Sequence, residues 1–156
     1  MIVRKLMVLL VAGSAVFAAT ACDDDTSTPG PERFSATLTG ASEVPPVTTT
    51  ATGTAIVEFT ATGLTFTVNV TGIQNVTLAH IHGPAAVGVN AAVILNLNPN
   101  LTVTTGLLAS GTATTTSNAA VSMDSLKVLI RNGNAYVNVH NTANPGGHIR
   151  GQLVRL

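Results

Sequence analysis

The sequence predicts one all-β domain, an antiparallel Greek-key β-sandwich or barrel of seven or eight strands with one short helix near residues 122–132. Three observations lead to this prediction. Apolar residues alternate with Thr, Asn and Ser along most of the chain, which is the period of a half-buried strand. Glycines and prolines separate the alternating segments at short intervals, as hairpins require. The length of 156 residues suits one domain.

The strands follow one another closely. We expect them within residues 33–40, 52–63, 64–73, 75–83, 91–99, 106–116, 134–141 and 147–156. Four apolar side chains share one face of the third strand: Leu64, Phe66, Val68 and Val70. Successive side chains of a strand point to opposite faces, so this set predicts the core side. Gly63 and Gly72 end the second and third strands, where turns are needed.

One segment departs from the strand period. Apolar side chains recur at helical spacing in it: Met123, Leu126, Leu129 and Ile130. Ser122 is a typical N-cap, Asp124 lies in the first turn, and Arg131 with Gly133 closes the end. The pattern predicts a short amphipathic helix packed across one end of the sheets.

The first residues have the layout of a secretory signal. Arg4 and Lys5 precede an uncharged apolar run of 14 residues, 6–19, which is too short to span a bilayer comfortably. Residues 1–21 are therefore predicted to be a signal peptide. Cys22, the one cysteine of the chain, lies at the cleavage point and resembles the acylated cysteine of bacterial lipoproteins. The alternative is an ordinary signal peptide that is cut after Ala21.

The lipoprotein interpretation sets the expected location. Residues 22–33 contain "DDDTSTPGPE" and read as a flexible tether, so the folded domain is expected over residues 34–156. We expect a lipid anchor at Cys22 to hold the domain at a bacterial cell envelope, on the periplasmic or the cell-surface side. Removal of the signal leaves five basic and seven acidic residues. Without a basic patch, nucleic acid is not an expected partner.

All four histidines lie in two short pieces, "LAHIHGPA" and "YVNVHNTANPGGHIRG". His80 and His82 are two residues apart and should point together, with Ile81 towards the core. The same alternation puts His140 on an outer face of its own strand. Two histidines from one strand and a third from another form a donor set for zinc or copper, to which His148 would add a fourth ligand. The alternative is that these side chains are polar surface residues bonded to loop backbone.

The sequence contains few residues from which a catalytic site could be built. The expected domain holds three acidic residues, Glu43, Glu58 and Asp124, so a two-carboxylate hydrolase would be hard to assemble. No nucleophile–base–acid set stands out, and we expect no catalysis. In a purely structural module, we expect Glu43 to pair with Arg150, and Pro45–Pro46 to stiffen the first crossover.

Three pieces of the chain together resemble the CHRD domain, a family named from chordin and found in bacterial secreted proteins. They are "FSATLTGASEVPPVTTTATGTA", "LAHIHGPA" and "GNAYVNVHNTANPGGHIRGQL", in the order of the family. The resemblance implies a β-sandwich and an extracellular binding or structural module with a protein partner, as in chordin. The usual family ending is Gly-Glu-Ile-Arg-Gly, and here His148 replaces the glutamate. His148 is therefore not a feature of the family.

Residues 53–84 are also similar in layout to the strands that lead to the His-x-His motif of copper–zinc superoxide dismutase. This chain lacks the disulfide cysteines of that enzyme and its zinc-binding loop. Likeness of fold does not transfer function. The sequence leaves three hypotheses in order: a tethered binding or structural module, a copper- or zinc-binding module that uses the histidines, and a redox enzyme, which is the least favoured.

Overall fold

The computed structural model describes residues 30–156, and the predicted signal peptide, Cys22 and most of the tether lie outside the described residues. The strands are β1 (Arg33–Thr39), β2 (Thr52–Phe59), β3 (Leu64–Thr71), β4 (Val76–His82), β5 (Val93–Asn96), β6 (Gly106–Ala113), β7 (Tyr136–Asn141), β8 (Ile149–Gln152) and β9 (Val154–Arg155). The helices are η1, a single 3₁₀ turn (Gly40–Ser42), and α1 (Met123–Arg131). The predicted all-β class with one helix is confirmed.

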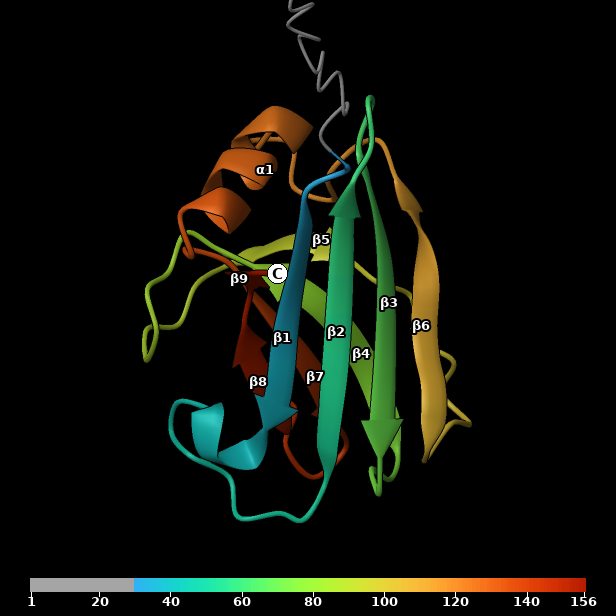
Figure 1. Ribbon diagram of the computed structural model, residues 1–156. Coiled ribbons are helices and arrows are strands. Elements are labelled where there is room, and N and C mark those ends of the chain that lie inside the picture. Colours follow the sequence, from blue (N-terminus) through green and yellow to red (C-terminus); the bar gives the residue numbers. More distant parts are fainter. Residues whose placement is uncertain (1–29) are drawn as a thin grey trace, which may run out of the picture.

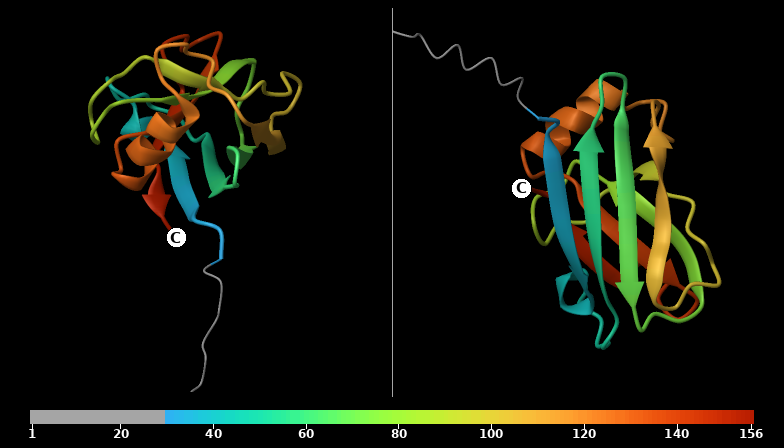
Figure 2. Two further views of the ribbon diagram at one scale, coloured as in Figure 1. Left: turned by 90° about the horizontal axis from the view of Figure 1, so that it is seen from above. Right: turned by 45° about the vertical axis from the view of Figure 1, so that its right-hand side comes forward.

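The strands form one antiparallel sheet that curls on itself (Figures 1 and 2). Its order is β5-β4-β7-β8-β1-β2-β3-β6, and β9 pairs with β1 beside this path. In Figure 1, β1, β2, β3 and β6 form the near layer, and β4, β7 and β8 lie behind it. The two layers are halves of one sheet, joined where Thr39 of β1 pairs with Arg150 of β8.

The core fills the space between the two layers. The predicted face of β3 is confirmed, because Leu64, Phe66, Val68 and Val70 are all buried in one cluster. Ile81 of β4 and Val137 and Val139 of β7 enter the same cluster from the opposite layer. The alternation of the sequence thus defines the core side of both layers.

Helix α1 packs over one end of the sandwich, as predicted (Figure 1). The Ser122 side chain accepts a hydrogen bond from the Ser125 amide at 3.1 Å, which satisfies one of the free donors of the first turn. Leu126 and Ile130 are buried against the core. Gly133 ends the helix with φ +67°, a conformation that favours glycine. Among the described residues, no helix is long and apolar enough to cross a membrane.

The outer face of β4 and β7 differs from the sequence prediction. Alternation places Tyr136, Asn138 and His140 away from the core, yet every residue of β7 is buried. The reason is a cover of loops whose groups bond to this face. Ala91 contacts His82, Pro145 contacts His140, and Glu43 contacts Asn138. The face is therefore a second, polar interior.

Candidate metal centre

Three histidines meet in this polar interior. His80 and His82 project from β4, and His140 projects from the neighbouring strand β7, where it pairs with Leu78. The His80 Nδ1 atom lies 3.1 Å from the His140 Nε2 atom. One ring nitrogen from each histidine lies within 4.8 Å of the other two. The adjacency that the sequence spacing could not establish is thus a consequence of the pairing of β4 with β7.

Backbone carbonyls orient two of these rings. The His82 Nδ1–H group donates to the Ala91 carbonyl at 3.0 Å, and the His140 Nδ1–H group donates to the Pro145 carbonyl at 3.0 Å. Each bond fixes the tautomer and leaves the Nε2 lone pair facing the cluster. Metal-binding histidines are commonly held by such a bond from the second ring nitrogen. The His82 Nε2 atom is buried and has no hydrogen-bond partner among the described residues.

The environment keeps the three rings neutral. Burial, together with the neighbouring His140 and His82, lowers the pKa of His80 to about 4. Burial also lowers the pKa of His82 and of His140, although their bonds to the backbone carbonyls oppose the shift. A neutral imidazole offers the lone pair that a metal ligand needs.

The spacing of the nitrogens fits a transition-metal ion. A metal–nitrogen bond of about 2.0–2.1 Å places two ligand atoms roughly 3.4 Å apart in a tetrahedral or trigonal site. The His80 and His140 nitrogens at 3.1 Å are close to this separation. His82, with its buried Nε2 atom that has no hydrogen-bond partner, would complete the set.

An aromatic and a cationic side chain extend the cluster on one side. The Tyr136 ring stacks on the His82 ring with centroids 4.9 Å apart and planes inclined by 3°. The guanidinium carbon of Arg150 lies 3.4 Å above the centre of the Tyr136 ring. Arg150 donates to the Asn90 side chain and to the Val89 carbonyl, which are both uncharged acceptors. We call His82, Tyr136 and Arg150 the stacked column.

His148, the predicted fourth ligand, is not part of the group of three histidines whose nitrogens lie within 4.8 Å of one another. Its Nε2 atom lies 3.1 Å from the Thr49 hydroxyl and its Nδ1 atom 2.8 Å from the Asn144 side-chain amide. Both ring nitrogens therefore have partners in the loops. The glycines before His148 turn the chain at this point, and Gly147 has φ +142°.

The predicted ion pair between Glu43 and Arg150 does not form, and no ion pair of the described residues includes either side chain. Glu43 instead accepts a long hydrogen bond, 3.5 Å, from the Asn138 side chain. Burial raises the pKa of Glu43 to about 7, although the charge of Arg150 opposes the shift.

Pro45 and Pro46 lie in the loop that follows Glu43 and precedes β2, in agreement with their predicted place in the first crossover.

The alternation of β7 predicts that Tyr136 and Asn138 share the face of His140, but it does not assign them to the site. Ala91 and Pro145 act through their backbone carbonyls, and no side-chain pattern reports such a role.

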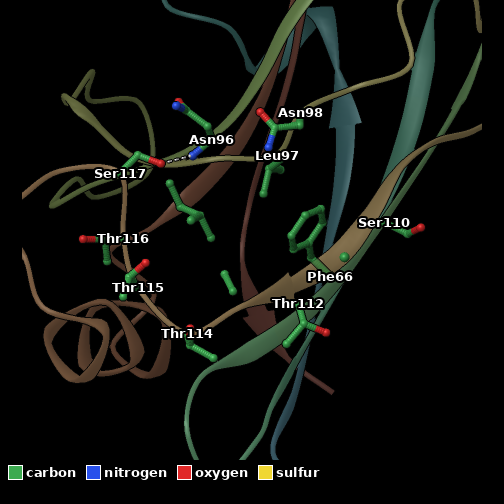
Figure 3. A pocket seen from close by; sticks show the side chains of 13 residues that line it. Phe66, Asn96, Leu97, Asn98, Ser110, Thr112, Thr114, Thr115, Thr116 and Ser117 are labelled. Carbon is green, nitrogen blue, oxygen red and sulfur yellow. Dashed lines mark hydrogen bonds between the residues drawn. The ribbon is translucent and has the colours of Figure 1, made fainter.

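A separate hollow of about 400 Å³ opens between the two edge strands of the curled sheet (Figure 3). Its wall carries Asn96 at the end of β5, Asn98 shortly after it, and Ser110 and Thr112 on β6, while Phe66 lies at its base. The lining side chains are apolar, hydroxyl or amide groups, and none of them titrates near neutral pH. This hollow offers neither a nucleophile with a base nor a metal ligand set.

Comparison with known proteins gives one match. The model of the CHRD domain family matches residues 34–153, which include every strand except β9 and the first residue of β1. No curated protein and no solved structure matches the chain.

Proposed function

The chain belongs to the CHRD domain family, and from this premise we propose that it is an extracellular binding module that holds one copper or zinc ion on His80, His82 and His140. Family membership supports an extracellular binding or structural module. The metal is our addition, and it rests on one observation: three buried, neutral imidazoles present nitrogens within 4.8 Å of one another.

Unpaired polar atoms in the polar interior support the presence of a ligand. Buried polar atoms are nearly always paired, because an unpaired one forfeits about 1–3 kcal/mol. Three buried side-chain atoms of the described residues have no partner, and all lie in the polar interior: Glu43 Oε1, His82 Nε2 and Asn138 Oδ1. A bound metal ion would use the His82 nitrogen.

The test is metal retention. The full-length protein is loaded with copper or zinc, desalted, and its metal content is measured. We expect about one ion per chain in the parent and in the matched control His148→Ala, and less than a tenth of that in His80→Ala/His82→Ala. Equal metal content in the double variant would contradict the proposal.

The alternative is a structural module in which the histidines only bond to loops and whose ligand is an extracellular protein. It predicts the same melting temperature with and without metal. A metal that binds only the folded state at a hundred times its Kd stabilises by about 2.7 kcal/mol, which such a melting experiment detects.

We further propose that Cys22 carries a lipid that anchors the domain at the cell envelope. The signal layout of residues 1–21 and the polar segment predicted as a tether in residues 22–33, of which Arg33 belongs to β1, support this location. Substitution Cys22→Ser should move the protein from the membrane fraction to the soluble fraction of the envelope. An unchanged distribution would argue for the ordinary signal peptide.

A further inference from the structure

The ligand set of the proposed site carries no negative charge. Its three donors are imidazoles, and the cluster contains no carboxylate or thiolate. Glu43 is the one buried carboxyl group among residues 30–156, and its hydrogen-bond partner is Asn138 rather than a histidine. Any positive charge that an ion brings into this site therefore stays uncompensated by its ligands.

A fixed positive charge lies beside the same site. Arg150 is 2% exposed and rests on Tyr136, whose ring stacks on His82. Its hydrogen bonds go to the neutral side chain of Asn90 and the neutral carbonyl of Val89. The stacked column thus holds a guanidinium one ring away from a ligand, and an arginine does not lose its charge in a protein.

The number of donors also distinguishes between ions. Zinc is almost always four-coordinate, and with three protein ligands it takes a water or substrate as the fourth. A monovalent copper ion is satisfied by two or three nitrogen ligands. The His82 Nε2 atom is fully buried, so water has no access to it in this conformation.

From these three features we infer that the site of the proposed function selects monovalent copper over divalent zinc. The inference rests on the proposed function and specifies its ligand. The guanidinium carbon lies 3.4 Å from the Tyr136 ring centre, which lies 4.9 Å from the His82 ring centre. A positive charge roughly 8 Å away, at an effective dielectric constant of about 20, disfavours each additional unit of ionic charge by roughly thirtyfold in affinity. The lack of an anionic ligand adds to this preference.

The first experiment compares the two ions on the full-length wild-type protein. Cuprous ion, kept reduced without oxygen, and zinc ion are each titrated in competition with a chromophoric chelator of known affinity. We expect an affinity for cuprous ion at least a hundred times that for zinc. Equal or tighter zinc binding would overturn the inference and leave the proposed function standing. If neither ion is retained, the proposed function fails, and the inference fails with it.

A matched pair of variants tests the role of the guanidinium. Arg150→Lys keeps the positive charge, and Arg150→Gln removes it, while both lose the forked hydrogen bonds. We expect the copper-to-zinc affinity ratio to stay within about threefold in Arg150→Lys and to fall by tenfold or more in Arg150→Gln. An equal copper-to-zinc affinity ratio in both variants would show that the charge of Arg150 does not cause the preference for copper. If the variants do not fold, the wild-type ratio still decides the inference.

Discussion

His80 and His140 are separated by 60 residues in the chain, yet their nearest ring nitrogens lie 3.1 Å apart. In the absence of a metal, the His140 Nδ1–H group donates a hydrogen bond to the Pro145 carbonyl, so the His140 Nε2 atom accepts a hydrogen bond from the His80 Nδ1–H group. Both nitrogens of this contact are candidate metal ligands. A metal ion would replace the proton between them.

The orientation of His82 should depend on Tyr136. The Ala91 amide donates to the Tyr136 hydroxyl at 3.1 Å, and the Ala91 carbonyl accepts from His82 at 3.0 Å. Substitution Tyr136→Phe keeps the stacked ring but frees Ala91, so we expect metal affinity to fall about tenfold, in the range that loss of an outer partner produces. Chelator competition measures this change. Unchanged affinity would show that the stacked ring alone holds His82.

Glu43 should make stability depend on pH. Its pKa is about 7 in the folded protein, above the ordinary value of 4.5, because the carboxyl group is buried. Between pH 4.5 and 7 the folded protein binds the proton more tightly than the unfolded chain does. The protonated Glu43 therefore contributes its full stabilisation of the fold below pH 4.5, and this stabilisation is lost as the pH rises through 7.

Substitution Glu43→Gln removes this dependence. As the pH rises from 4.5 to 8, the wild type loses the contribution of Glu43 and the variant does not. We therefore expect the free energy of unfolding of the variant to increase relative to that of the wild type by roughly 1–3 kcal/mol over this range. The histidines titrate in both proteins, so their effect cancels in the difference. Denaturant unfolding at several pH values gives the comparison, with Glu58→Gln on the surface as the control for loss of a charge. A difference that is flat with pH would show that Glu43 stays ionised in the fold.

Two adjacent glycines should differ sharply in their tolerance of alanine. Gly147 has φ +142°, and a Cβ atom there would lie 2.5 Å from the Asn138 amide nitrogen and 2.6 Å from a Glu43 oxygen. A Cβ at Gly146 meets nothing within 4 Å. We expect Gly147→Ala to lower the free energy of unfolding by about 2 kcal/mol or more and Gly146→Ala to change it by less than about 0.5 kcal/mol. Similar values for both variants would mean that the loop yields without strain.

The N-terminal cap of α1 provides a test of the helix. Ser122→Ala removes the acceptor of the Ser125 amide, and we expect a loss of about 1 kcal/mol in the free energy of unfolding. Ser122→Asp keeps an acceptor and should retain most of the stability. If both variants unfold at the same denaturant concentration as wild type, the cap contributes nothing measurable.

The sequence predicted most of the fold because one periodicity governs it. Leu64, Phe66, Val68 and Val70 fill one face of β3, and Ser122 and Gly133 bound the helix as their residue types indicate. The shared face of His80 and His82 follows from the same two-residue period.

The rest depends on contacts that no local pattern contains. Pairing of β4 with β7 is a long-range choice, and it alone brings His140 to His80. The burial of the histidines was not foreseen, because loops cover them through the backbone carbonyls of Ala91 and Pro145. His148 was assigned to the set from its residue type, whereas the turn at Gly147 directs it towards Thr49.

The place of β1 in the sheet has a consequence for the order in which the chain assembles. β1 pairs with β2, which follows it directly, and also with β8 and β9, the final strands of the described chain. During synthesis the N-terminal hairpins emerge early, but the two layers can join only after the last strands arrive. Long-range pairing of this kind makes folding slow. His140 lies on β7, late in the chain, so His80 and His82 can meet it only after β7 has been made, and the polar interior cannot be complete before then.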